Sequence, residues 1–366
     1  MATPRVGLIG LPNVGKSTLF NAVARTAELA RAANFPFCTI EPNKAPIAVP
    51  DPYLKELSKT FVAADSDDDC VGVIRPARME LIDVAGLVKG ASRGEGLGNQ
   101  FLAAIRECDV VVHVLRYFPD PEILRHSHET DDTIFVDPVF DAEIVDTELL
   151  LADLSHVERR LDRIKEDTAF EKIVLKKVQE GLLQSIPARY IGLSYDEKFA
   201  IKSMGLLTLK PIVYAFNVDE LDYTANREQV MTKIQTDYMP KIQECILVSA
   251  KLEEDLLSLG GSKEQGDYLE ELMGMTTTTT GDGDSGGGGG GGNASQSSRS
   301  SLTAYGLAGR IHGDLQKGFI RAEVIKAKDL LQFDTLMKAK EAGCVRTEGK
   351  EYTIEPDDIV LIKWRA

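Results

Sequence analysis

The sequence predicts an α/β fold with a mostly parallel sheet, an inserted helical hairpin and a small α+β module near the C-terminal end. Two observations predict the sheet. An apolar run leads directly into a glycine-rich loop and a helix near residue 10, and continuous apolar runs, typical of strands buried on both faces, recur later. The hairpin is predicted because, between residues 141 and 186, the apolar spacing changes to the four-three period of packed helices.

The glycine-rich loop, residues 10–17, reads Gly-Leu-Pro-Asn-Val-Gly-Lys-Ser and precedes a helix-forming stretch. In this G-x-x-x-x-G-K-[ST] pattern, consecutive N–H groups and the positive end of the helix face phosphate oxygens. Lys16 is expected to reach the β- and γ-phosphates, and the Ser17 hydroxyl to hold Mg²⁺. A chance glycine-rich turn is the alternative, so other parts of a nucleotide site must follow in order. The predicted phosphate-binding residues here are Asn13, Val14, Gly15, Lys16, Ser17 and Thr18.

Two further segments match the metal and γ-phosphate elements of such a site. Thr39 lies in a proline-rich loop, where P-loop GTPase folds place a threonine that closes onto Mg²⁺ and the γ-phosphate. Asp83 ends the strand pattern 78–82 and is expected to bind Mg²⁺ through water, while the Gly86 N–H senses the γ-phosphate. Leu87 stands where Ras-like GTPases carry the glutamine that orients the attacking water. Another residue must position that water, or turnover will be slow.

His113 lies near the carboxyl end of the apolar run 110–115, which is predicted to be a buried parallel strand. Two hypotheses remain open for this residue. It is either a hydrogen-bonded core histidine or a residue close to the phosphates, where strand ends gather in open α/β sheets. The first hypothesis gives His113 a role in stability, and the second gives it a role in the chemistry.

Two later strand patterns end in segments that match base-recognition elements. The strand pattern 210–217 runs into Asn217-Val218-Asp219-Glu220, and a second one leads to Ser249-Ala250-Lys251. GTP-binding domains carry N-K-x-D and S-A-K at these two strand ends. The second element is intact here, whereas Val218 and Glu220 alter the first.

Composition and charge restrict the classes of function. The formal charge of −15 argues against a protein that coats nucleic acid, which needs clustered Lys and Arg, and no sequence-specific DNA binding is expected. The five cysteines form no C-x-x-C pair, which suits reduced thiols in a cytoplasmic protein. His126 and His128 indicate a solvated loop rather than a metal site. We expect neither a membrane span nor a secretory signal, because no run approaches 18 apolar residues.

The same patterns divide the chain into four segments. The apolar stripe of the hairpin comprises Leu150, Leu154, Val157, Leu161, Ile164, Leu175, Val178 and Leu182. A Thr/Gly/Ser tract that cannot bury apolar surface is expected to be a flexible linker. The predicted domains are a nucleotide-binding domain at 1–136 plus 205–275, the hairpin at 137–204, the linker at 276–301 and the α+β module at 302–366.

Together these motifs resemble the Obg-like ATPase family, the YchF group of P-loop NTPases. Residues 10–21, 34–43 and 83–101 match the family pattern almost letter for letter. The resemblance implies a GTPase-like domain, an inserted hairpin and a C-terminal TGS domain. The Thr/Gly/Ser tract replaces the family's connecting segment and the first β-hairpin of that last domain. A truncated TGS-like domain with an exposed sheet edge is therefore expected.

The resemblance also implies roles for individual residues. The family prefers ATP over GTP and uses Mg²⁺, and Asn13 would help to hold K⁺. His113 would take the water-positioning role that Leu87 cannot fill. The longer Glu220 side chain would disturb recognition of guanine, because an unpaired polar edge in a closed site costs about 1–3 kcal/mol. Adenine would be bound mainly by Asn217 and Phe118, so the base-binding residues are Phe118, Asn217, Val218, Glu220, Ser249 and Ala250.

The first functional hypothesis is a cytoplasmic ATPase that hydrolyses ATP slowly and uses its nucleotide state to switch binding to the translation machinery. The ribosome is the expected partner by resemblance. Two alternatives stay open. One is a GTPase, and the other is a nucleotide-gated binding module without meaningful turnover, which Leu87 favours.

Overall fold

The computed structural model describes residues 3–32, 43–51, 53–54, 56–58, 76–84, 97–119, 137–165, 169–238, 244–259, 262–274, 302–333 and 335–365. The chain forms two compact units. The first comprises residues 3–47 and 78–283, and the second comprises residues 48–77 and 284–366.

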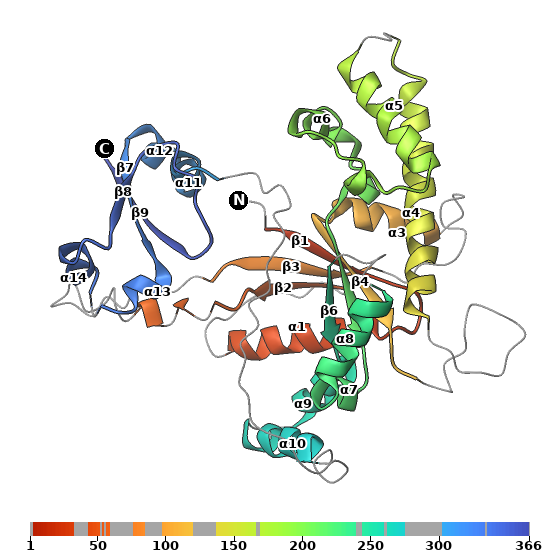
Figure 1. Ribbon diagram of the computed structural model, residues 1–366, viewed down its shortest axis with the longest axis horizontal. Coiled ribbons are helices and arrows are strands. Elements are labelled where there is room, and N and C mark those ends of the chain that lie inside the picture. Colours follow the sequence, from red (N-terminus) through yellow and green to blue (C-terminus); the bar gives the residue numbers. More distant parts are fainter. Residues whose placement is uncertain are drawn as a thin grey trace, which may run out of the picture. The chain divides into compact units, whose positions relative to one another are not determined.

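A six-stranded sheet forms the centre of the first unit, in the order β2-β3-β1-β4-β5-β6 (Figure 1). Its strands are β1 (Arg5–Ile9), β2 (Lys44–Ala48), β3 (Arg78–Asp83), β4 (Val110–Arg116), β5 (Ile212–Asn217) and β6 (Cys245–Val248). The strands from β3 to β6 pair in parallel. Bonds from Asp83 N to Asn43 O (2.9 Å) and from Val49 N to Ala77 O (2.8 Å) make β2 an antiparallel edge strand. The predicted mostly parallel α/β fold is confirmed.

Helices cover both faces of this sheet, as Figure 1 shows for α1 (Lys16–Ala32) and α3 (Leu97–Glu107). Successive strand residues point to opposite faces. Leu8 of β1 accordingly packs in one apolar cluster with Phe20 of α1. Ile9 belongs to the larger cluster that also contains Phe101 of α3. The remaining helices of this unit are α4 (Pro138–Leu161), α5 (Phe170–Leu183), α6 (Tyr195–Ala200), α7 (Glu220–Thr224), α8 (Arg227–Asp237), α9 (Ala250–Ser258) and α10 (Ser262–Gly274).

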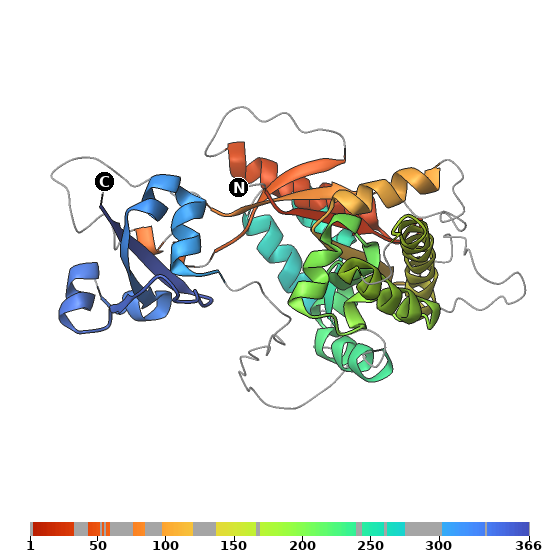
Figure 2. The ribbon, with the colours of Figure 1, turned by 90° about the horizontal axis from the view of Figure 1, so that it is seen from above.

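The inserted hairpin consists of α4 and α5, which lie side by side in both views (Figures 1 and 2). Asp137 begins α4 as its N-cap, accepting bonds from Val139 N and Phe140 N. The predicted stripe is the core of the hairpin, in which Val157, Leu175, Val178 and Leu182 are buried and Leu150, Leu154, Leu161 and Ile164 pack against them. The first half of α4 also contributes to the core of the sheet, so the hairpin is anchored in the sheet by one continuous helix.

A buried carboxylate joins the hairpin to the sheet. Asp153 of α4 is fully buried and accepts bonds from Leu207 N (2.9 Å), Thr208 N (2.7 Å) and Thr208 Oγ1 (2.7 Å). These donors belong to the 3₁₀ helix η4 (Leu207–Leu209), which leads into β5. Burial raises the pKa of Asp153, which the three hydrogen bonds oppose. The end of the insertion is thereby held against α4.

The C-terminal part of the second unit is a three-stranded antiparallel sheet in the order β8-β7-β9. One face packs on a cluster that includes Ala304, Ala308 and Val324. The other face packs on a cluster that includes Ile325, Leu330 and Ala339. This is the predicted small α+β module. Its elements are α11 (Ala304–Ile311), α12 (Gly313–Lys317), β7 (Phe319–Lys326), α13 (Ala327–Leu330), α14 (Leu336–Glu341), β8 (Arg346–Glu348) and β9 (Asp358–Trp364).

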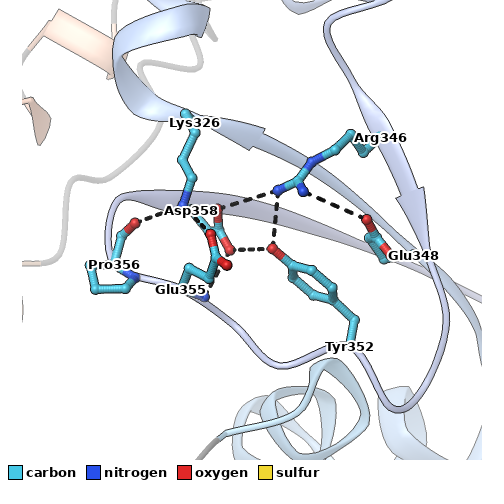
Figure 3. Close-up of polar contacts among 7 residues, drawn as sticks. All are labelled: Lys326, Arg346, Glu348, Tyr352, Glu355, Pro356 and Asp358. Atoms are coloured by element: carbon cyan, nitrogen blue, oxygen red, sulfur yellow. Dashed lines mark hydrogen bonds and ion pairs between the residues drawn. The ribbon is translucent and has the colours of Figure 1, made fainter. Parts of the chain in front are cut away.

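A polar cluster around Asp358 stabilises this module (Figure 3). The Asp358 side chain is fully buried. Its Oδ2 accepts hydrogen bonds from the Tyr352 hydroxyl (2.7 Å) and from Glu355 N (2.9 Å). Lys326 Nζ lies 2.8 Å from its other oxygen, and Arg346 approaches to 3.8 Å. Burial opposes ionisation of Asp358, but the Lys326 contact and the hydrogen bonds hold its pKa below the usual range. The start of β9 is thus fixed to the end of β7.

The second unit also includes part of the connection between β2 and β3. Leu57, in the helical stretch at residues 56–58, packs against the cluster of Ile325, Leu330 and Ala339. The sequence predicts a nucleotide-binding domain that includes all of residues 1–136, and the compact unit that contains the C-terminal module also includes residues 48–77.

Several predicted features lie outside the described residues. They are Thr39, Gly86, Leu87, the pair His126 and His128, and the linker at 276–301. Among the helices that the structure does describe, none is both long and apolar enough to cross a membrane.

Candidate functional site

The phosphate loop follows β1, which lies between β3 and β4 in the middle of the sheet. Open parallel sheets bind their ligands at such a point, outside the carboxyl ends of the strands. Gly10 has φ 155°, and a Cβ there would lie 2.6 Å from the carbonyl oxygen of Val114. Asn13 has φ 63°, a left-handed conformation that asparagine tolerates. Only glycine fits at the start of this loop, which lies directly against β4.

The structure brings together Lys16, Ser17 and Asp83. Lys16 Nζ lies 2.7 Å from Asp83 Oδ1, and the Ser17 hydroxyl donates to Asp83 Oδ2 at 2.8 Å. The side chains of Lys16 and Asp83 are only 9% and 10% exposed. A hydroxyl and a carboxylate are the hard oxygen donors that Mg²⁺ prefers, so this set fits the metal. The sequence predicts phosphate and Mg²⁺ roles for these three residues, and the structure places Lys16 and Ser17 within hydrogen-bond distance of Asp83.

Asn217 connects the phosphate loop to the base-recognition segment. Its Nδ2 donates to Val14 O (2.9 Å), and its Oδ1 accepts from Ala250 N (2.9 Å). The side chain is 3% exposed, and it occupies the space that a Cβ on Gly15 would need. Each end of the amide keeps one further N–H or lone pair for a ligand. Asn217 therefore links the phosphate loop to the start of α9.

We predict that Asn217→Ala weakens both the fold and ATP binding. Two buried backbone groups, Val14 O and Ala250 N, would lose their partner, at about 1–3 kcal/mol each. The free energy of unfolding should fall by about 2–4 kcal/mol in urea denaturation. Asn226→Ala is the matched control, because the bond of its amide within the described structure goes to a single, partly buried neighbour four residues away, Asp222 Oδ1 at 3.1 Å. Equal, small losses for both variants would contradict the bridging role of Asn217.

The altered base motif has its own ion pair. Glu220 Oε1 lies 2.6 Å from Lys251 Nζ, and Lys251 is the residue that follows Ser249 and Ala250. Val218 is buried, and its N–H bonds to Val248 O (2.9 Å). Ser249 caps α9 by accepting from Leu252 N. Lys251 was not predicted as a site residue, although its place directly after Ala250 was the available signal.

Phe118 lies two residues beyond the end of β4. The residue before it, Tyr117, donates its N–H to Asn217 O at 2.9 Å, so Phe118 lies near the carboxyl end of β5. The Phe118 ring is half-buried and lies 5.1 Å from the guanidinium of Arg116. Arg116 Nε also donates to Phe118 O at 3.1 Å. The predicted aromatic base-binding residue is thus fixed beside the base segment.

His113 lies in the middle of β4 rather than at its end. It pairs with Ile9 of β1 and with Tyr214 of β5, because β4 continues to Arg116 between these two neighbours. The His113 side chain is fully buried, and neither ring nitrogen has a hydrogen-bond partner among the described residues. Burial, with a smaller effect of the Arg189 charge, lowers its pKa to about 3. The ring is therefore neutral, one residue away from the Val114 carbonyl that touches the phosphate loop.

Three residues near His113 were not predicted from the sequence. The Tyr214 ring centroid lies 5.5 Å from that of His113, and the Tyr214 hydroxyl donates to Asp146 Oδ2 at 3.0 Å. Arg189 Nη2 lies 3.6 Å from Asp146 Oδ1. They come from β5, α4 and the 3₁₀ helix η2 (Ala188–Tyr190), so no local sequence signal connects them.

A phosphate loop at the switch point of a parallel sheet, with an Asp–Ser pair suited to Mg²⁺, defines a P-loop nucleoside-triphosphate-binding protein. Comparison with family models agrees. Residues 5–140 match the model described as 50S ribosome-binding GTPase. Residues 296–365 match the model of the YchF GTPase C-terminal domain, described as a protein of unknown function. The chain belongs to the YchF family of P-loop NTPases, and its C-terminal domain is present.

Curated relatives cover the whole chain. It is 37% identical over 379 aligned positions to "Ribosome-binding ATPase YchF" of Bacillus subtilis, spanning 98% of this chain and 99% of the relative. It is 33% identical to "Obg-like ATPase 1" of Caenorhabditis elegans, spanning 99% of this chain and 92% of the relative. The solved structure of the Schizosaccharomyces pombe YchF GTPase matches with a TM-score of 0.70 at 29% identity, covering 99% and 98% of the two chains.

Proposed function

We propose that this protein is a Mg²⁺-dependent ATPase that prefers ATP over GTP and hydrolyses it slowly. The observation that carries the proposal is the combination of the Lys16–Asp83–Ser17 arrangement with the altered base motif. Lys16 and the loop backbone from Asn13 to Thr18 bind the β- and γ-phosphates. Ser17 and Asp83, together with Thr39, would hold Mg²⁺, which would neutralise charge on the phosphates. The Gly86 N–H would complete the γ-phosphate contacts, and Asn13 would help to hold K⁺.

The preference for adenine rests on Glu220. Guanine recognition in N-K-x-D proteins uses a free carboxylate that accepts two hydrogen bonds. Glu220 is longer than that Asp, and its carboxylate pairs with Lys251 Nζ at 2.6 Å. Guanine would then leave polar groups unpaired, whereas Asn217 and Phe118 offer a hydrogen-bonding amide and a ring to adenine. Val218, Ser249 and Ala250 complete the base pocket.

Base preference is tested by titrating fluorescent ATP and GTP analogues. The wild-type protein should bind ATP more tightly. Glu220→Asp should reduce the preference by about tenfold, because the shorter carboxylate leaves Lys251 and regains the guanine geometry. Glu253→Asp, a conservative change on α9, serves as the control. Tighter binding of GTP by the wild type would refute this interpretation and support the GTPase alternative, and the fission-yeast relative is itself called a GTPase.

Hydrolysis is assigned to His113, which orients the attacking water in place of the glutamine that Leu87 replaces. One observation favours a second candidate function. The full burial of His113 favours a nucleotide-gated binding module without meaningful turnover. Phosphate release no faster than the uncatalysed background, measured with and without K⁺, would establish that alternative.

We further propose that the nucleotide state switches association with the ribosome in the cytoplasm. The support is the name of the bacterial relatives, ribosome-binding ATPases at 36–37% identity. Co-sedimentation with ribosomes should differ at least severalfold between ADP and a non-hydrolysable ATP analogue. Equal sedimentation in both states would contradict a nucleotide switch.

A further inference from the structure

A buried polar cluster connects the helical insertion to His113. We call Asp146, Arg189 and Tyr214 the His113 cluster, since Tyr214 lies against the His113 ring at 5.5 Å between centroids. The Asp146 carboxylate is shared between the Tyr214 hydroxyl (3.0 Å) and Arg189 Nη2 (3.6 Å). The side chains of Arg189 and Asp146 are 11% and 24% exposed, and Tyr214 is buried. One polar cluster is thus shared by the insertion and the sheet.

The observed orientation of His113 is unsuited to hydrolysis. A residue that orients water must bring a ring nitrogen within hydrogen-bond reach of that water. The His113 ring is fully buried and neither nitrogen has a partner among the described residues, so it contacts no solvent. Hydrolysis therefore needs a second orientation of this side chain.

Something must hold the ring where it is. A buried imidazole without hydrogen bonds is unfavourable, so the ring remains only if its surroundings restrain it. Tyr214 is the restraining side chain that the structure shows, and its hydroxyl is fixed by Asp146. Arg189 in turn holds Asp146, and its Nη1 also donates to Thr208 O (3.4 Å).

We propose that Asp146, Arg189 and Tyr214 are positioning residues that retain His113 in its buried orientation, so that the insertion sets the rate of ATP hydrolysis. The inference rests on the proposed function of His113. Asp146 and Arg189 both belong to the insertion, and the Arg189 guanidinium stacks at 5.1 Å on Tyr190, which is 41% exposed.

The test is steady-state ATP hydrolysis by Tyr214→Phe, which keeps the ring and removes its hydrogen bond to Asp146. We expect kcat to rise about fivefold with KM for ATP unchanged. Losing about one net hydrogen bond should shift the equilibrium between the buried and the water-orienting positions of His113 by about fivefold. Asp146→Asn, which removes the charge opposite Arg189, is a second variant, and its kcat is also expected to rise. Lys177→Met is the matched control on the insertion, because its described partners, Gly192 O and the Glu197 carboxylate, belong to the insertion itself.

Two further measurements separate this inference from the proposed function. In a His113→Leu background, Tyr214→Phe should no longer raise kcat; a rise that persists would overturn the inference. NMR of histidine-labelled protein should show a His113 signal that titrates well below its ordinary pKa in the wild type and at a higher pH in Tyr214→Phe, because a larger fraction of the rings then reaches solvent. An unchanged signal would also overturn it. Wild-type turnover in His113→Leu alone would instead refute the catalytic role, while NMR still reports on the cluster.

Discussion

Replacing Lys16 with alanine is expected to abolish ATP binding, with a loss of at least about 100-fold in affinity. The Lys16 ammonium is the cation of the phosphate loop, and charge-assisted hydrogen bonds to buried groups contribute about 1.5–3 kcal/mol each. The substitution also leaves Asp83, which is only 10% exposed, without the partner at 2.7 Å.

The measurement for Lys16→Ala is a fluorescence titration with an ATP analogue in the presence of Mg²⁺. Circular dichroism shows whether the variant is folded. Lys233→Ala, a change on α8, is the control and should bind like the wild type. A folded Lys16→Ala protein with unchanged affinity would show that the loop is only structural.

Replacing His113 with leucine is expected to cut turnover while leaving the protein at least as stable. The ring makes no hydrogen bond among the described residues, so an apolar side chain of similar volume removes an unfavourable burial. A water-orienting group contributes about 10²–10⁴-fold, and a slow enzyme should show a loss near the low end of that range. KM for ATP should stay unchanged, because positioning of water acts in the transition state.

The two hypotheses for His113 are separated by measuring kcat, KM and Tm together. His156→Leu is the matched control, because His156 is a partly buried histidine of α4 that also has an unpartnered ring nitrogen in the described structure. A His113→Leu protein that melts at a higher temperature but hydrolyses ATP at the wild-type rate would show that His113 has only a packing role.

The local features of this protein follow from its sequence. Eight consecutive residues predict the phosphate loop, and the strand patterns at 78–82, 110–115 and 210–217 agree with β3, β4 and β5 within one or two residues. The hairpin stripe, from Leu150 to Leu182, is the observed helical core. These features are readable because side-chain period and turn chemistry act between residues close together in the chain.

Only the tertiary structure decided which distant residues meet. The Asn217 bonds to Val14 and Ala250, the Glu220–Lys251 pair and the packing of Leu57 on the C-terminal module each join separate segments. The face to which His113 points depends on the register of β4 against β1 and β5, since a shift of one residue would turn it to the opposite side. Arg189 reaches that face only because the insertion returns to the sheet through η4, where Asp153 fixes the chain. These contacts are set by strand register and chain return, which no local pattern encodes.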